Sequence, residues 1–416
     1  MAKPKLALIP AAQGSKFYSV LPSSGVGDFD FTRSGSATRI NSQGLIETVA
    51  NGVSRLNYPL IDGKVVGCPS HLLENSATNL QVNSEEFDNT LWNKARASIT
   101  PNDAISPSGL LNADKLVGTS GTSSYLFDGV SVVSGSVYTI SVFAKYIDIS
   151  EFVIVNFTQS GNAYFNIENG TVISNFGTIT EPKIENYGNG WYRCSVKFTA
   201  NATQAVAYGP FLNNATDKSV NIWGASFELG DYVTSYIPTT TSTVTRSAET
   251  ANGSGDTSTF NNSEGVLMAE ISALTNNNPL FNSLSIASGT TNVLSIGFSD
   301  SLNKLYVFKT NGSSSWFEEV LVNDITNFNK IALSYESNDN QFWINGFKIK
   351  TNNSIGINPS AMSDMDFNAA VGNEFMYSNT KQIQYYNSAL TESELETLTS
   401  WVSFSDMANG QLYTIQ

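Results

Sequence analysis

Short runs in which apolar and polar residues alternate recur along the whole chain. One such stretch, DFDFTRSGSATRINSQGLIETVANGVSRLNYPL, spans residues 28–60 and carries three arginines. A period of two residues is typical of β-strands that have one face covered. Val, Ile, Tyr, Phe and Thr are frequent in these runs and favour strands, while the intervening Gly, Ser and Asn favour turns. The pattern predicts an all-β protein.

The runs fall into three blocks. Residues 1–80 hold short alternating stretches and predict a β-rich N-terminal region. Residues 81–248 hold seven further runs, SVYTISVFAKY and VNIWGASFEL among them, and predict a β-sandwich of the jelly-roll type. Residues 249–263 are poor in large apolar side chains and predict a linker. Residues 264–402 predict a second β-sandwich, and residues 403–416 a C-terminal tail.

Two local signals stand out in the last block. Asn345-Gly346 between two apolar runs is typical of a hairpin with a type I′ turn. Thr391 followed by Glu394 is a capping box, which predicts that a helix begins here. Leu395 and Leu398 supply the apolar face of this helix. No other part of the chain predicts a helix with comparable clarity.

The charge of the chain excludes some partners. Its 416 residues carry 22 basic and 36 acidic side chains, a net charge of −14. Because nucleic-acid binding needs clustered Lys and Arg, and no basic run is present, we expect no such partner. No apolar run approaches the length of about 18 residues that a membrane span requires, so we expect no membrane insertion. Cys68 and Cys194 lie far apart in the sequence and are expected to be buried free thiols.

Catalytic constellations are weak. The only histidine is His71, and a lone histidine is more often structural than catalytic. Neighbouring acidic residues such as Glu318 and Glu319 point to opposite faces of a strand, so they do not converge by themselves as a glycosidase requires. We therefore expect no enzymatic activity. A polysaccharide depolymerase that uses carboxylates distant in sequence stays open as an alternative.

Several phrases together resemble bacteriophage virion proteins. These are FTRSGSATRINSQGLIETVANGVSRLNY, HLLENSATNLQVNSEEFDNTLWNK and WGASFELGDYVTSYIPTTTSTVTRSAE. In those proteins a short N-terminal region precedes a carbohydrate-binding-module-like jelly roll, and the resemblance covers about the first 248 residues. NKIALSYESNDNQFWINGFKI and IQYYNSALTESELETL resemble a laminin-G-like or concanavalin-A-like lectin sandwich. The resemblance implies a tail fibre, head fibre or related surface protein located in the virion.

Carbohydrate binding needs aromatic side chains, because sugar rings present apolar CH faces. Trp316 lies beside a flexible Gly-Ser turn, where a core residue is less expected, and is the first candidate. Tyr125 and Tyr377 are further candidates on similar grounds. The other five tryptophans are expected to pack in the cores of the sandwiches.

The resemblance also raises the question of calcium, since such sandwiches often hold a structural Ca²⁺ on carboxylate and carbonyl oxygens. The aspartate expected on the last strand of the jelly roll is missing from the segment 223–228. Asp364 and Asp366 would share one face of an extended strand and are weak candidates, with a solvated loop as the alternative. No other cofactor is expected.

Arg33 and Arg39 are expected to pair with carboxylates or carbonyls at a subunit or virion contact. The whole sequence then predicts a structural component of a phage particle that projects its sandwiches toward host-surface glycan. Its partners would be other phage structural proteins and further copies of itself, as a trimer or else a dimer. A second alternative is a decoration protein without a glycan site, whose aromatic side chains would all be buried or at subunit contacts.

Overall fold

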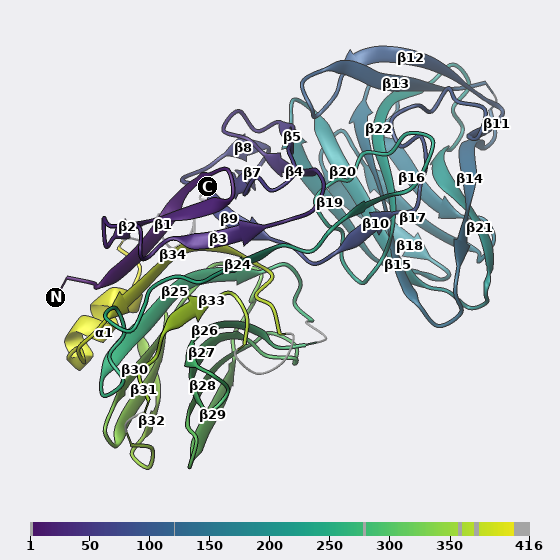
Figure 1. Ribbon diagram of the computed structural model, residues 1–416. Coiled ribbons are helices and arrows are strands. Elements are labelled where there is room, and N and C mark those ends of the chain that lie inside the picture. Colours follow the sequence, from purple (N-terminus) through teal and green to yellow (C-terminus); the bar gives the residue numbers. More distant parts are fainter. Residues whose placement is uncertain (1–2, 120, 278–279, 357–359, 370–373, 403–416) are drawn as a thin grey trace.

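The computed structural model describes residues 3–119, 121–277, 280–356, 360–369 and 374–402. Within these residues every regular element except one helix is a β-strand, so the predicted all-β fold class is confirmed. Two β-sandwiches account for most of the strands (Figure 1). The expected tail 403–416 lies outside the described residues. No described helix has the length and apolar character needed to cross a membrane.

The first sandwich consists of two antiparallel six-stranded sheets. The β14 sheet runs, in spatial order, β11 (Asn93–Ala95), β14 (Ser124–Val132), β21 (Gln204–Leu212), β16 (Glu151–Asn156), β17 (Gly161–Asn166) and β18 (Thr171–Phe176). The β15 sheet runs β12 (Ala97–Ile105), β13 (Leu111–Gly118), β22 (Ser219–Leu229), β15 (Val137–Tyr146), β20 (Trp191–Thr199) and β19 (Ile179–Gly188).

Large apolar side chains fill the space between these two sheets. Trp92 is part of this core, whereas Trp191 and Trp223 pack with Ile46 and Tyr236 in a separate cluster on the other face of the β15 sheet. All three tryptophans are almost fully buried, as expected from the sequence. Cys194 is buried as well, whereas Cys68 is exposed, which corrects the expectation that both thiols are buried. Cys68 lies in the connection before β9 (Ser70–Leu73), outside any strand, and no core packs over it.

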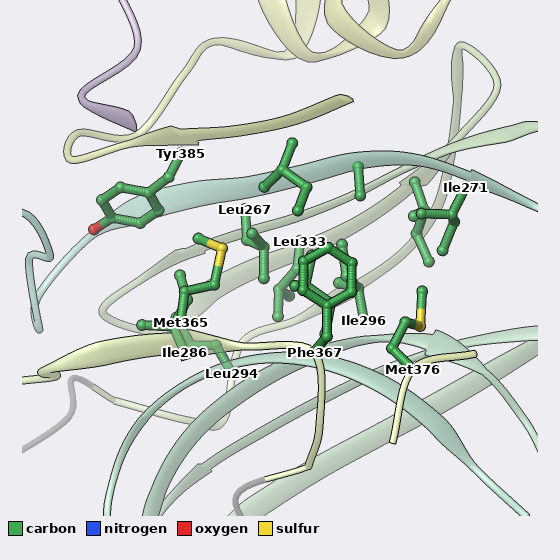
Figure 2. Close-up of a cluster of buried hydrophobic side chains, with 14 of the residues drawn as sticks. Leu267, Ile271, Ile286, Leu294, Ile296, Leu333, Met365, Phe367, Met376 and Tyr385 are labelled. Atoms are coloured by element: carbon green, nitrogen blue, oxygen red, sulfur yellow. The ribbon is translucent and has the colours of Figure 1, made fainter. Parts of the chain in front are cut away.

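The second sandwich packs a five-stranded sheet against a longer one. The short sheet runs β29 (Ser315–Leu321), β28 (Lys304–Asn311), β27 (Asn292–Phe298), β26 (Asn282–Ser288) and β33 (Asp364–Asp366). The facing strands are β34 (Ser378–Tyr386), β25 (Gly265–Ala273), β30 (Asn329–Glu336), β31 (Asp339–Ile344) and β32 (Phe347–Asn352). Figure 2 shows side chains from both layers meeting in one core, with Leu267, Leu333 and Tyr385 facing Ile286 and Leu294.

The N-terminal strands belong to the long sheet of the second sandwich. The sheet continues from β34 through β1 (Leu6–Gln13), β2 (Lys16–Leu21) and β3 (Phe29–Thr32) to β24 (Thr250–Asn252), and β9 and β6 (Leu56–Asn57) also join it. β1 is antiparallel to β34, with Ala7 opposite Gln384, and Leu6 and Leu8 are fully buried in the common core. In Figure 1 these N-terminal strands lie beside the C-terminal ones.

Residues 249–263, which the sequence marks as a linker, are tied to the same core. Besides β24, this segment contributes Phe260, whose ring contacts that of Tyr385 at a centroid distance of 5.0 Å. His71 is also part of this region. It is buried and stacks on Phe17 at 3.9 Å, and burial lowers its pKa to about 4, so the ring is neutral at pH 7. This placement agrees with a structural role for the histidine.

Three two-stranded sheets complete the strand inventory: β4 (Ala37–Ile40) with β5 (Ile46–Val49), β7 (Leu60–Ile61) with β8 (Lys64–Val65), and β10 (Ala77–Asn79) with β23 (Val244–Arg246). The helix α1 (Glu392–Thr399) begins at the predicted capping box of Thr391 and Glu394. Asn345 and Gly346 both have positive φ, as the predicted type I′ turn requires.

A cluster of buried charged side chains joins the N-terminal block to the segment that follows the first sandwich. This Arg–Glu cluster consists of Arg33, Arg55 and Glu74 from the N-terminal block, and of Arg246 and Glu249, which follow the first sandwich. Nη1 of Arg33 lies 2.7 Å from Oε1 of Glu249, and Nε of Arg55 lies 2.9 Å from the same oxygen. Nη1 of Arg55 and of Arg246 lie 2.8 and 3.0 Å from Oε2 of Glu74.

The cluster is nearly dry, since the side chains of its three arginines and of Glu249 are fully buried and that of Glu74 is 4% exposed. Burial alone would raise the pKa of Glu74, but Arg246 and Arg55 outweigh it and lower the pKa to about 2. Backbone N–H groups supply further hydrogen bonds to the two carboxylates. The N–H of Ser235 donates to Glu74, and the N–H of Glu74 donates to Glu249. Removing one partner from such a site leaves an uncompensated buried charge and costs about 3–5 kcal/mol.

The variant Glu74→Gln tests this. We expect it to lower the free energy of unfolding at pH 7 by roughly 3 kcal/mol, measured by urea denaturation. Because the pKa of Glu74 is about 2 in the folded protein and near 4.5 when unfolded, its contribution is complete above pH 4.5 and declines as the pH falls toward 2. The difference between wild type and variant should shrink over that range.

The matched control is Glu47→Gln, which removes a carboxylate that is 43% exposed and paired with Arg39. An exposed pair contributes at most about 1 kcal/mol. Equal losses of stability in the two variants would contradict the importance of the buried cluster.

Candidate functional site

Strand alternation places four aromatic side chains on the outer side of the β14 sheet. In β14, Leu126 points into the core while Tyr125 and Phe127 point away from it. Tyr125 lies opposite Phe211 of β21, and Phe157 follows β16 directly. The ring of Tyr125 lies 5.0 Å from that of Phe157 and 6.1 Å from that of Phe211. We call Tyr125, Phe127, Phe157 and Phe211 the aromatic face.

Polar groups and a shallow hollow accompany these rings. The guanidinium carbon of Arg96 lies 4.8 Å from the ring centre of Tyr125, and Nε of Arg96 donates to the carbonyl oxygen of Ser123. A hollow of about 270 Å³ lies between Tyr125, Phe157 and Phe211, and Asn162 and Ser160 also line it. The site therefore combines apolar ring surface with hydrogen-bonding groups.

The apolar surface extends toward the edge of the same sheet. Residues directly opposite each other on neighbouring strands have their side chains on one side of the sheet. Phe211 lies opposite Val153, which lies opposite Tyr164, so Tyr164 is on the side of the aromatic face. Its ring contacts that of Phe176 at 5.9 Å, and Phe176 is 60% exposed.

The predicted ligand residue Tyr125 thus lies at the centre of an exposed aromatic surface, together with three residues that the sequence analysis did not select. Phe127 could have been found from the same run, because SYLFD repeats an aromatic residue at a spacing of two. Phe157 and Phe211 come from other strands, and the sequence contains no signal that brings them next to Tyr125.

Trp316 does not fit the role expected of it. It lies in β29, is 6% exposed and packs in the core of the second sandwich, so it offers no ring face to a sugar. The following residue, Phe317, points to the outer side and is 45% exposed. There it lines a second hollow, of about 420 Å³, with Phe281 and Tyr306. The sequence predicted Trp316 to be open to a ligand, but in the structure Trp316 faces the core and Phe317 faces outward.

Tyr377 is half-buried and lies between the two sandwiches. Its backbone N–H donates to Oδ1 of Asn282, and its ring contacts that of Phe375 at 6.1 Å. Burial raises the pKa of its phenol. Together with Tyr232 and Leu229 of the first sandwich it lines a cavity of about 220 Å³. Tyr377 is therefore remote from the aromatic face and belongs to a different surface.

The two arginines expected at a docking contact have different environments. Arg33 pairs with a carboxylate, as expected. This partner is Glu249 of the same chain, however, and the side chain of Arg33 is fully buried. A side chain in that position is not available to a virion or a second subunit, which corrects its expected role. Arg39 pairs with Glu47 across the β4–β5 hairpin and is 27% exposed. Its role in docking stays a prediction.

Asp364 and Asp366 share one face of β33, opposite Ala287 and Ser285 of β26. The pKa of Asp366 is raised to about 6. Burial is the largest cause, and the neighbouring carboxyl of Asp364 raises the pKa as well, whereas the hydrogen bond from the N–H of Gly253 lowers it. Within the described residues no group of three His, Cys, Asp or Glu side chains could hold a metal ion. Burial and the neighbouring carboxyl account for the raised pKa of Asp366, and calcium binding at this pair stays a prediction.

The variant Asp366→Asn tests this interpretation. A carboxyl whose folded pKa is raised from 3.8 to about 6 destabilises the fold once the pH rises above that range. Asparagine keeps the oxygen that accepts from Gly253 and removes the charge. Because Asp366 is partly open to solvent, we expect a gain of only about 1 kcal/mol in the free energy of unfolding at pH 7.5, and none below pH 3.8.

Calcium provides the control for this experiment. Addition of Ca²⁺ should leave the melting temperature of both proteins unchanged. A rise in the melting temperature of the wild type but not of Asp366→Asn would instead identify the pair as a metal site.

No protein-family model matches this chain, and no curated protein matches it. Among solved structures, it is similar to the Ruminococcus gnavus IT-sialidase CBM40, with 13% identity over 33% of this chain and 84% of that chain and a TM-score of 0.30. It is also similar to domain 4 of AbnA, a GH43 extracellular arabinanase from Geobacillus stearothermophilus, in complex with arabinotriose. The identity is 12% over 37% of this chain and 73% of that chain, and the TM-score is 0.30.

A native heptameric SAP-like pentraxin from Limulus polyphemus matches with 12% identity over 34% of this chain and 71% of that chain, at a TM-score of 0.27. All three matches cover roughly a third of this chain at low identity. The β-sandwich fold and the candidate site are accordingly established from the sheets and side chains of this chain itself.

Proposed function

We propose that this chain is a non-catalytic glycan-binding protein whose first sandwich binds sugar on the aromatic face. The observation that carries the proposal is the grouping of Tyr125, Phe157 and Phe211 around one hollow on the outside of a β-sheet, with the ring of Phe127 beside that of Tyr125. Aromatic side chains that are not needed for a core cost solubility, and contiguous exposed apolar surface usually marks an interaction site.

The chemistry of this surface fits a sugar. The rings offer apolar faces on which the CH groups of a pyranose can pack, while Asn162 and Ser160 supply hydrogen-bonding groups at the rim of the hollow. Arg96 stacks on Tyr125 and fixes the position of its ring before any ligand arrives. A hollow of this shallow kind implies modest affinity per site, which several copies in an oligomer would multiply.

The arrangement of carboxylates supports binding without hydrolysis. A glycosidase needs two carboxyls about 5–10 Å apart across the scissile bond. In the second sandwich Asp364 and Asp366 are neighbours on one face of the short strand β33, and do not face each other across a groove. Glu319 forms an ion pair with Lys304, and Glu374 is the one carboxylate among the described residues that line the adjacent aromatic hollow. A depolymerase is therefore the weaker alternative.

The variant Tyr125→Ala tests glycan binding. A screen of the full chain on a glycan array should first identify a ligand, and isothermal titration calorimetry should then show at least a tenfold loss of affinity for the variant, because the central ring is removed. The matched control is Tyr18→Ala, which removes an exposed tyrosine on β2, outside the aromatic face. Unchanged affinity in Tyr125→Ala would contradict this site, and a wild type that binds no glycan at millimolar concentration would contradict the function.

We further infer that the chain is a surface component of a phage particle, as a tail or head fibre. The support is the resemblance of the phrases in its first 248 residues to virion proteins, together with the acidic net charge of −14, which suits an exposed and soluble component. In this setting the sandwiches would present the aromatic face to host-surface glycan, and the chain would assemble with other virion proteins and with further copies of itself.

Gradient-purified virions encoded by the same genome provide the test. Mass spectrometry should detect this chain in the particles, and an antibody against the second sandwich should label one structural position in electron micrographs. Light scattering of the isolated protein should give the mass of a trimer or a dimer. A chain found only in the infected-cell lysate, and never in purified particles, would contradict the virion role.

A further inference from the structure

Three adjoining cavities form one crevice between the two sandwiches. The largest, of about 530 Å³, and a second, of about 240 Å³, share Ile40, Asn57 and Tyr187 in their walls. The second adjoins the cavity of about 220 Å³ that contains Tyr377, because both are lined by Thr234. The N-terminal block, the first sandwich and the second sandwich each supply a wall. The crevice is on a different surface from the aromatic face.

Four asparagines line the largest cavity, and all four use their amide group in the same way. Oδ1 of Asn57 accepts from the N–H of Ile40, and Oδ1 of Asn186 accepts from the N–H of Gly188. Oδ1 of Asn379 accepts from the hydroxyl of Ser70, and Oδ1 of Asn169 from that of Thr171. Because backbone N–H groups can only donate, the amides of Asn57 and Asn186 cannot be oriented the other way.

The Nδ2 groups of these four asparagines are left as donors. None of them has a hydrogen-bond acceptor among the residues that the structure describes, and each asparagine borders the cavity. The protein therefore fixes each amide through its oxygen and presents the nitrogen. Four donors in one crevice suit a ligand that is rich in oxygen acceptors, which would replace the water around them.

Arg193 lies beside the second cavity and is 3% exposed. Its Nε donates to Ser141 and its Nη1 donates to the carbonyl oxygen of Thr234. Its Nη2 is closed to solvent and lies near the phenol of Tyr187, so a ligand does not reach this group directly. The donors that the crevice offers to a ligand are therefore those of the asparagines.

We propose that the crevice between the sandwiches binds an uncharged linear oligosaccharide, as a second glycan site. Hydroxyl and ring oxygens supply the acceptors that the asparagines lack, and the rings of Tyr58, Tyr187 and Tyr192 line the same cavity and can pack on sugar CH faces. The carboxylates of Glu185 and Asp62 are also in its wall, which disfavours an anionic chain.

This inference shares its ligand class with the proposed function, but it concerns different residues, so the two can fail separately. The experiment uses the full chain carrying Tyr125→Ala, which removes the aromatic face. Saturation-transfer NMR and calorimetry with malto-, cello-, xylo-, manno- and chitohexaose supply the neutral probes, and hexagalacturonate supplies the anionic one. We expect one neutral hexasaccharide to bind and hexagalacturonate not to bind.

The decisive variants are Asn57→Asp and Asn379→Asp, made together in the Tyr125→Ala chain. Each keeps the oxygen that accepts the internal hydrogen bond and replaces the Nδ2 donor by an acceptor, so the fold is preserved while the crevice loses two donors. We expect at least a tenfold loss of affinity. Asn352→Asp is the matched control, because Oδ1 of Asn352 also accepts an internal N–H, from Ser354, and this residue is outside the crevice.

Each outcome decides between the sites. Loss of all binding in Tyr125→Ala would overturn the crevice site and leave the aromatic face as the glycan site. Binding that is unaffected by Tyr125→Ala but lost with the two Asn→Asp changes would support the crevice and overturn the aromatic face. An equal effect of Asn352→Asp, or binding of hexagalacturonate at the crevice, would contradict the proposal.

Discussion

The structure depends on a charge cluster that is buried where three parts of the sequence meet. Glu249 and Glu74 lie between Arg33, Arg55 and Arg246, so the N-terminal block and the segment after the first sandwich are bound to each other through five charged groups. Each of these charges is tolerable in a dry site only when its partners are in place. The cluster therefore fixes the N-terminal block between the sandwiches, and this position defines the walls of the crevice.

Much of the fold could be predicted from the sequence because local rules determine it. Alternation identified the strands, Asn345-Gly346 identified a hairpin, and the Thr391 and Glu394 pair located the start of the helix. The pairing of β1 with β34 could not be predicted, because it joins residues more than 370 positions apart and no local pattern specifies that register. The same limit applies to Arg33, whose partner Glu249 lies 216 positions away.

The candidate site, like the fold, could be predicted only in part from the sequence. Tyr125 was selected, like Trp316, because it lies beside a flexible turn. Phe157 and Phe211 come from other strands, and only the sheet topology shows that these strands are neighbours of β14. Trp316 was assigned to the wrong side of its strand, where a shift of one residue exchanges core and surface. The crevice has no sequence signal, since its asparagines look like the many turn residues of the chain.

Together these features give the chain two surfaces that we propose for polyhydroxylated ligands, one on a sheet and one between modules. The second surface exists only while the modules keep a fixed relative position. The Arg–Glu cluster contributes to that position, because it links the end of the first sandwich to the N-terminal block, whose strands belong to the sheet of the second sandwich. Pulsed electron–electron resonance between spin labels at Ser134→Cys and Lys350→Cys, in a Cys68→Ser chain, measures that position directly. The account predicts one narrow distance distribution that broadens in Glu249→Gln. A broad distribution in the parent chain, or no change in the variant, would contradict it.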